Sequence, residues 1–250
     1  MKLNAISVII LNSVLASTAA MAQTKAPEPD YTLSYNVGVV SDYRFRGIAQ
    51  SATNPALQAG VDFAHKSGFY LGAWGSNISW IKDYAGATEG SLEIDLYGGY
   101  KGELSKDFTY DLGVIGYQYP GNTAATNANT TEIYGALSYG LVTAKYSRSV
   151  GNFVANPSSS GSAYFEVAAN FDLGSGFTLT PHVGRQSIPN VVNSAGDYTD
   201  YSLTLAKDFG SGLSATLAAV GTNADKPFYT DTKGKFLGDS ALVVGVKYSF

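Results

Sequence analysis

The sequence has 250 residues, a formal net charge of −4, no cysteine, 28 glycines and 18 tyrosines, and only 14% of its residues are charged. The missing cysteines exclude a disulfide framework and thiolate metal sites, and the absence of a basic block gives a nucleic-acid partner no electrostatic support. A weakly charged chain rich in glycine and tyrosine leaves two main classes, a soluble all-β protein or a transmembrane β-barrel.

Residues 1–22 have the three-part order of a secretory signal peptide. Lys2 supplies the early positive charge, an apolar stretch follows, and small residues lead to Ala20-Met21-Ala22. The apolar stretch is shorter than the roughly 20 residues that a membrane-spanning helix needs. We therefore expect cleavage after Ala22 and a short periplasmic segment over 23–30.

From Tyr31 onward the chain alternates apolar and polar residues, which is the period of β-strands. Twelve strands are predicted near 31–48, 54–66, 68–82, 89–104, 107–120, 130–140, 142–152, 162–173, 176–188, 197–209, 212–223 and 236–250. In the third of these, Trp74 and Trp80 share one face while Phe69 shares the other with Leu71, so a bulge or a change of face is expected there.

The connections between the predicted strands alternate in length. Tight turns such as "GSG" follow the even-numbered strands, and long polar loops such as "NADKPFYTDTKGK" follow the odd-numbered ones. This sorting predicts that residues 31–250 form a transmembrane antiparallel β-barrel of about 12 strands in the bacterial outer membrane. The short turns and both termini would lie in the periplasm, the longer loops outside, and the apolar face of each strand against outer-membrane lipid.

The chain ends on a strand pattern in which Val246, Tyr248 and Phe250 occupy alternate positions. This ending resembles the C-terminal signal of outer-membrane proteins, which implies periplasmic chaperones and the barrel-assembly machinery as partners. Aromatic residues near the strand ends are expected to form a girdle at the periplasmic interface; they are Tyr31, Phe69, Phe108, Phe171, Phe177, Phe209 and Tyr248.

Several segments resemble one known family. They are "SDYRFRGIAQSATNPALQAGVDF", "GFYLGAWGSN", "EIDLYGGYKGEL" and "YDLGVIGYQYPG", of which the part around Arg44 and Gly47 is the most specific. The sequence is similar in these segments to the TorF family of bacterial outer-membrane porins, with Ala49 and Ala59 where the family pattern has Ser and Gly. The resemblance implies a porin and supplies no substrate.

Strand parity places charged residues in the lumen. The pore-lining candidates are Asp42, Arg44, Arg46, Asp62, Glu93, Asp95, Lys101, Asp111, Glu132 and Glu166. Asp42, Arg44 and Arg46 are predicted on the first strand, with Asp62 and Glu93 offering acids nearby. The charges can form a transverse field that selects small polar solutes, or a salt-bridge network that fills the barrel. The excess of inward acids over bases predicts a weak preference for cations.

The sequence predicts neither an enzyme nor a cofactor. It has only two histidines, His65 and His182, and lacks the G-x-S-x-G elbow and the H-E-x-x-H and EF-hand patterns, so no metal site is expected. The favoured function is a narrow channel for passive diffusion of small polar solutes or ions. The alternative is a closed structural or surface-binding barrel that acts through its extracellular loops.

Overall fold

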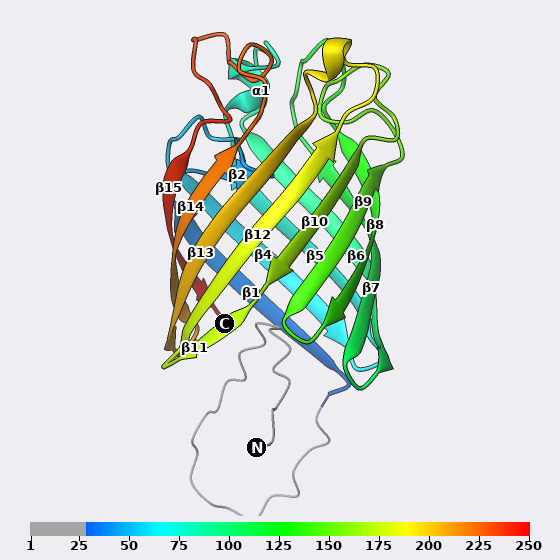
Figure 1. Ribbon diagram of the computed structural model, residues 1–250, viewed down its shortest axis with the longest axis vertical. Coiled ribbons are helices and arrows are strands. Elements are labelled where there is room, and N and C mark those ends of the chain that lie inside the picture. Colours follow the sequence, from blue (N-terminus) through cyan, green and yellow to red (C-terminus); the bar gives the residue numbers. More distant parts are fainter. Residues whose placement is uncertain (1–28) are drawn as a thin grey trace, which may run out of the picture.

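A computed structural model describes residues 29–250 (Figure 1), so the predicted signal peptide and its cleavage site lie outside the described residues. The described residues form a closed antiparallel β-barrel. Its strand segments are β1 (Tyr31–Val40), β4 (Ala56–His65), β5 (Phe69–Asn77), β6 (Leu92–Ser105), β7 (Phe108–Gln118), β8 (Thr130–Tyr139), β9 (Val142–Ser149), β10 (Ala163–Ala169), β11 (Phe171–Gly174), β12 (Phe177–Ser187), β13 (Tyr198–Gly210), β14 (Leu213–Thr222) and β15 (Ala241–Ser249). A second, small sheet pairs β2 (Arg44–Phe45) with β3 (Ile48–Ala49).

Every strand of the barrel pairs with both neighbours, which removes the open edges. β1 pairs with β15, and β10 pairs with β12, so the row of strands closes on itself. β10 and β11 follow each other along the chain and form one strand interrupted at Asn170, which makes the barrel twelve-stranded. At the seam, Tyr35 and Phe250 exchange two backbone hydrogen bonds of 2.8 and 2.9 Å. The predicted all-β barrel of about 12 strands is confirmed.

The two faces of the strands differ as the period-two pattern predicts. Outward side chains such as Leu57 and Leu112 are exposed, at 60% and 57% of their surface, whereas the inward carboxylates Glu93 and Glu132 are each only 1% exposed. An apolar outer band around a polar interior is the opposite of a soluble domain and is typical of a barrel in lipid.

Short turns gather at one end of the barrel and long loops at the other (Figure 1). We call these the turn end and the loop end. The turns span residues 66–68, 106–107, 140–141, 175–176 and 211–212, and the loops span residues 41–55, 78–91, 119–129, 150–162, 188–197 and 223–240. The seven aromatic residues predicted as a girdle are all exposed, and Phe108 stacks on Tyr139 at 4.5 Å.

Three predicted strands are too long. The twelfth, predicted over 236–250, begins only at Ala241. The first, predicted over 31–48, ends at Val40, and the chain then turns into the barrel as a hairpin. The third, predicted over 68–82, ends at Asn77 and gives way to the short helix α1 (Trp80–Asp83). Its pairing with β4 and β6 is continuous, so the expected bulge is absent, and the aromatic residues after Asn77 belong to a loop.

A 3₁₀ turn, Val192–Ser194, lies in one loop of the described chain. Within residues 29–250, no helix has the length and apolar character required to cross a membrane.

Candidate functional site

The candidate site is built on the segment 41–55, which we call the inward hairpin. It carries β2 and β3, joined by a tight turn in which Arg46 has φ +50° and Gly47 has φ +81°. Two successive positive φ angles are typical of a type I′ turn, where asparagine and glycine are the usual residues. An arginine in this conformation costs on the order of 1–2 kcal/mol, so other contacts must hold it.

Glycine is required at the tip of the inward hairpin because the tip touches the barrel wall. A Cβ on Gly47 would lie 2.6 Å from Cγ2 of Thr222 and 2.8 Å from Cβ of Asp200. Both distances are shorter than real Cβ contacts allow. The tip therefore lies directly against β13 and β14, across the barrel from β6 and β7.

Arg46 ties the inward hairpin to the opposite part of the wall. Its two terminal nitrogens donate to Glu132 at 2.6 and 3.0 Å, and one also donates to Gln186 at 2.8 Å. The guanidinium lies over the rings of Tyr164, Phe45 and Phe153, at 4.2, 4.7 and 5.5 Å from their centroids. The Arg46 and Glu132 side chains are 8% and 1% exposed, so this is a buried ion pair.

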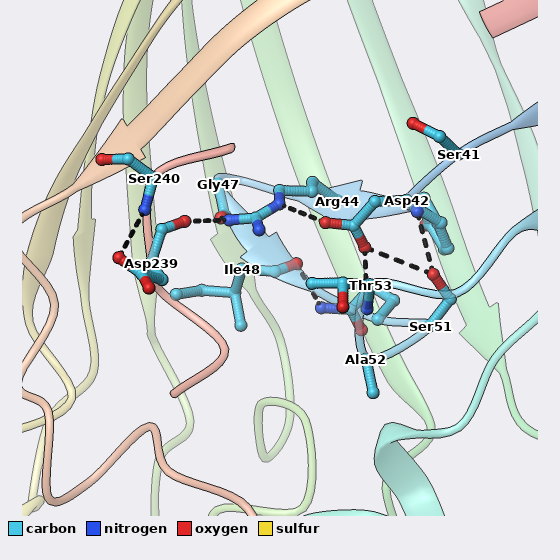
Figure 2. A network of polar contacts seen from close by, with 12 residues as sticks. Ser41, Asp42, Arg44, Gly47, Ile48, Ser51, Ala52, Thr53, Asp239 and Ser240 are labelled. Atoms are coloured by element: carbon cyan, nitrogen blue, oxygen red, sulfur yellow. Dashed lines mark hydrogen bonds and ion pairs between the residues drawn. The ribbon is translucent and has the colours of Figure 1, made fainter. Parts of the chain in front are cut away.

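Arg44 fixes the base of the inward hairpin (Figure 2). Its Nε donates to Asp42 at 2.7 Å, and its Nη1 donates to the backbone carbonyl of Asp239 at 2.6 Å. The other oxygen of Asp42 accepts the Ser51 hydroxyl at 3.3 Å and the Thr53 backbone N–H at 3.2 Å. These contacts join the first long loop to the last one and leave neither charge unpaired.

Tyr43 connects the inward hairpin to β6. Its hydroxyl donates to Glu93 at 2.9 Å, and its ring meets Trp74 edge to face at 5.3 Å. One oxygen of Glu93 and one of its neighbour Asp95 are buried without a hydrogen-bond partner. With the contacts of Arg46 and Gly47, the hairpin touches the wall on several sides and crosses the lumen near the loop end.

Five lumenal carboxylates accept a hydrogen bond from a tyrosine hydroxyl. The pairs are Tyr97 with Asp62 at 2.6 Å, Tyr70 with Asp111 at 2.6 Å, Tyr43 with Glu93 at 2.9 Å, Tyr164 with Asp200 at 2.9 Å, and Tyr117 with Glu132 at 3.3 Å. A phenol stabilises a carboxylate without cancelling its charge, because the phenol is neutral. Of the five, only Asp62 and Glu93 lack a base beside them, and the burial of Glu93 disfavours its charged form, so the uncancelled negative charge of this group lies chiefly at Asp62.

Bases cancel only part of this field. Lys101 lies 3.6 Å from Asp111 but is half exposed. Lys145 points its ammonium at the ring of Tyr134, 4.3 Å away. The imidazole of His182 contacts Glu166, one of the predicted lining residues, at 3.1 Å.

Two cavities lie in the lumen on the turn side of the inward hairpin. One, of about 360 Å³, is lined by Arg46, Lys145, Glu166, His182 and Asp200, among others. The second, of about 460 Å³, is lined by polar residues such as Asn36, Gln58 and Thr180, by the charged Lys207, Asp208 and Lys247, and by Trp74 with several glycines and valines. Polar cavities of this size hold water. The barrel interior below the hairpin is thus not filled by side chains.

The predicted lumenal residues lie inside the barrel, but the ion-pair partners of the arginines differ from those expected. Asp42, Arg44 and Arg46 lie on the inward hairpin and not on the first strand. The arginines pair with Asp42 and Glu132, not with acids of the neighbouring strands.

Sequence reasoning missed four side chains that hold the inward hairpin, namely Tyr43, Phe153, Tyr164 and Gln186. The inward parity of Tyr164 and Gln186 was the one available signal. Phe153 lies in a loop, where parity has no meaning.

Among residues 29–250, no group of three or more His, Cys, Asp or Glu side chains is arranged to hold a metal ion. His182 has Glu166, Asp200 and Tyr164 around it, at 3.1, 3.5 and 3.3 Å. The predictions that the chain has no metal site and no enzymatic activity stay predictions.

A family model matches residues 24–250, nearly the whole chain, and is described as "Bacterial protein of unknown function (Gcw_chp)". The chain belongs to this family. The match does not bear on the narrower resemblance to TorF. A comparison with curated proteins found no match.

Solved structures share the barrel at low sequence identity. The KdgM porin is 8% identical, with a TM-score of 0.54 over 87% of this chain and 98% of its own. The NanC porin is 11% identical, with a TM-score of 0.53 over 88% and 99%. An outer membrane channel from Pseudomonas putida is 12% identical, with a TM-score of 0.50 over 93% and 99%. This likeness establishes the fold.

Proposed function

We propose that this chain forms a narrow channel in the bacterial outer membrane, through which small polar solutes or ions diffuse passively. The observation that carries the proposal is the pair of polar cavities in the lumen, of about 360 and 460 Å³, inside a barrel whose outer face is apolar. A lumen that holds water in a closed barrel is what a diffusion channel needs.

The asymmetry of the barrel supports one orientation. Short turns, Tyr31 and Phe250 share the turn end, which we place in the periplasm, and the long loops face outside. The resemblance to TorF porins favours the same placement. We also propose that periplasmic chaperones deliver the chain and that the barrel-assembly machinery reads Val246, Tyr248 and Phe250, whose side chains are exposed on the outer face.

The inward hairpin is the constriction of this channel. It is held by a buried ion pair at Arg46 and by hydrogen bonds at Tyr43 and Arg44. It therefore narrows the lumen near the loop end and leaves open the space between the hairpin and the turn end. A loop that folds into a twelve-stranded barrel leaves room only for small solutes.

The charges of the lumen favour cations or neutral solutes. Five carboxylates are bound by neutral phenols; three of them also face a base, whereas Asp62 and Glu93 do not. One of the similar structures is the KdgM porin in complex with disordered oligogalacturonate, a polyanion. The uncancelled carboxylates of this chain oppose such a solute, so we propose a different solute class despite the shared fold.

A closed barrel that acts through its outer loops is the second candidate. The observation that favours it is the same inward hairpin, because its ion pair is buried and its tip touches the far wall. The two candidates differ in one property, the permeability of the lumen when the hairpin is in place.

Solute flux separates the two candidates. The refolded chain is placed in lipid vesicles, and osmotic swelling is followed with uncharged solutes of increasing size, from glycerol to a trisaccharide. The channel predicts fast swelling with the smallest solutes and a steep decline with size, relative to vesicles without protein. Swelling no faster than in those vesicles, with a correctly folded and heat-modifiable protein, would establish the closed barrel instead.

A further inference from the structure

The outer face of the barrel carries two arginines near the loop end. Arg148 on β9 lies between two buried serines, and Arg185 on β12 lies between buried Gly184 and Gln186. Because successive side chains of a strand point to opposite faces, both arginines point outward, away from the lumen. Both are exposed.

Little else on this side of the described chain is charged. No Asp or Glu of the described strands takes an outward position. The loops 119–129 and 150–162 contain no charged residue, and the loop 188–197 contains one, Asp197. This part of the loop end therefore has two positive charges against a single negative one.

Neither guanidinium is held tightly by a carboxylate. One terminal nitrogen of Arg185 lies 3.8 Å from Asp197, and the other donates to the Thr199 hydroxyl at 3.4 Å, with 52% of the arginine side chain exposed. An exposed pair at this distance contributes little. Among residues 29–250, no carboxylate lies within ion-pair distance of Arg148. Its guanidinium lies against Gly161, where a Cβ would be 2.9 Å from one nitrogen. Both arginines thus keep donors for an external anion.

The strand register brings the two arginines close to each other. Strand β10 pairs with both β9 and β12 (Figure 1), and its Ala163 and Phe165 are level with Arg148 and Arg185, respectively. The arginines therefore flank β10 and are offset by two residues. With strands about 4.8 Å apart and a rise of about 3.3 Å per residue, their Cα atoms are about 12 Å apart. Two long side chains can reach one anionic group across that distance.

Apolar surface lies beside the arginines and on their turn side. Tyr146, Phe165 and Val183 face outward there and are 45%, 50% and 48% exposed. Tyr146 and Phe165 pair across β9 and β10. Aromatic side chains at this level are typical of the edge of the apolar band, where lipid head groups begin. A free phosphate ion makes no use of this surface, whereas the chains of a lipid cover it.

From these observations we propose that Arg148 and Arg185 bind the phosphorylated head group of a lipid in the outer leaflet, with the lipid chains against Tyr146 and Phe165. The guanidinium fork matches a phosphate with two parallel hydrogen bonds. Basic residues next to the apolar band are attracted to anionic lipid head groups. The inference rests on the proposed orientation, in which the loop end faces outside, and not on conduction.

Native mass spectrometry of the refolded full chain, released from detergent micelles, tests the proposal. The probes are lipid A, a glycolipid with two phosphates, and the same glycolipid without phosphate. Titration should give one saturable lipid adduct with lipid A. With about fivefold in affinity for each arginine, the phosphate-free glycolipid should bind about 25-fold more weakly.

Matched variants locate the binding. Arg148→Gln and Arg185→Gln should each weaken lipid A binding about fivefold, and the double variant about 25-fold, while binding of the phosphate-free glycolipid changes less than twofold. Lys66→Gln removes an exposed cation at the turn end, and it should leave the affinity for lipid A unchanged. Heat modifiability of each variant shows that the barrel has folded.

Three results would overturn the assignment. Equal affinity for the two glycolipids, or unchanged affinity in the double variant, removes the arginines from lipid recognition. A loss in Lys66→Gln as large as in Arg148→Gln reduces the effect to the net charge of the chain. Displacement of lipid A by an excess of inorganic phosphate makes the site one for the free ion. Lipid affinity tests this site and conductance tests the channel, so either proposal can fail alone.

Discussion

The ion pair between Arg46 and Glu132 should decide whether the inward hairpin stays in the lumen. The change Arg46→Ala leaves Glu132 as an unpaired charge that is 1% exposed, and it removes the ring contacts of the guanidinium. Breaking one partner of a buried pair costs about 3–5 kcal/mol. Because every 1.4 kcal/mol is tenfold, the ratio of released to inserted hairpin rises by roughly two to three and a half orders of magnitude.

Planar-bilayer recording measures the release of the hairpin directly, as a change in unit conductance. Arg46→Ala should show a larger unit conductance than the wild type, or frequent transitions to a larger open level. The double change Arg46→Met with Glu132→Gln removes both charges and keeps similar volumes, so it should restore conductance close to that of the wild type. Conductance steps identical in Arg46→Ala and the wild type would refute the reasoning, because the hairpin would then not be the constriction.

Three further predictions concern the wall, the outer face and the field of the barrel. Gly72→Ala places a Cβ 2.3 Å from a tyrosine ring and should lower the unfolding free energy by about 1–3 kcal/mol in urea titrations, whereas Gly116→Ala, with its nearest contact at 3.4 Å, should change it little. Leu112→Arg, on the outer face, should cost about 2–4 kcal/mol in the same assay and Leu104→Arg, near a turn, about 0–1; equal costs would contradict the membrane placement. Asp62→Asn should move the reversal potential in a salt gradient toward zero, and an unchanged potential would remove this carboxylate from the selective path.

The barrel could be predicted from the sequence because a membrane barrel is governed by local rules. Outward positions meet lipid and inward positions meet water, so the alternation persists through much of strands such as β7, over 108–114, and β13, over 200–205. Strand ends were predicted to within a few residues where a glycine turn follows. The predicted girdle residues are exposed for the same reason.

The inward hairpin could not be predicted, because its sequence continues the alternation of the first strand. Tyr43 and Phe45 stand on the apolar parity, with Arg44 and Arg46 on the polar one, although the pairing with β4 and β15 has already ended at Val40. A strand and a hairpin inside a barrel both place one face against polar groups. Only the Arg46-Gly47 pair signals a turn, and arginine is unusual in that position.

The ion-pair and hydrogen-bond partners of the lumenal charges could not be predicted from the sequence either. Parity places a side chain inside the barrel but does not say which opposite strand it meets. Arg46 reaches Glu132, 86 positions along the chain, because the hairpin carries it across the lumen. The tyrosine partners of the carboxylates follow from diagonal contacts between strands, which depend on the register and tilt of the closed barrel.

Single-channel recording of the wild-type chain tests the central claim most directly. The purified, refolded protein is inserted into a planar bilayer under a salt gradient, and both the step size and the reversal potential are read. The account predicts small discrete steps that reverse toward the cation potential. A heat-modifiable, correctly folded barrel that stays silent would contradict the channel, and steps that reverse toward the anion potential would contradict the field assigned to the lumen.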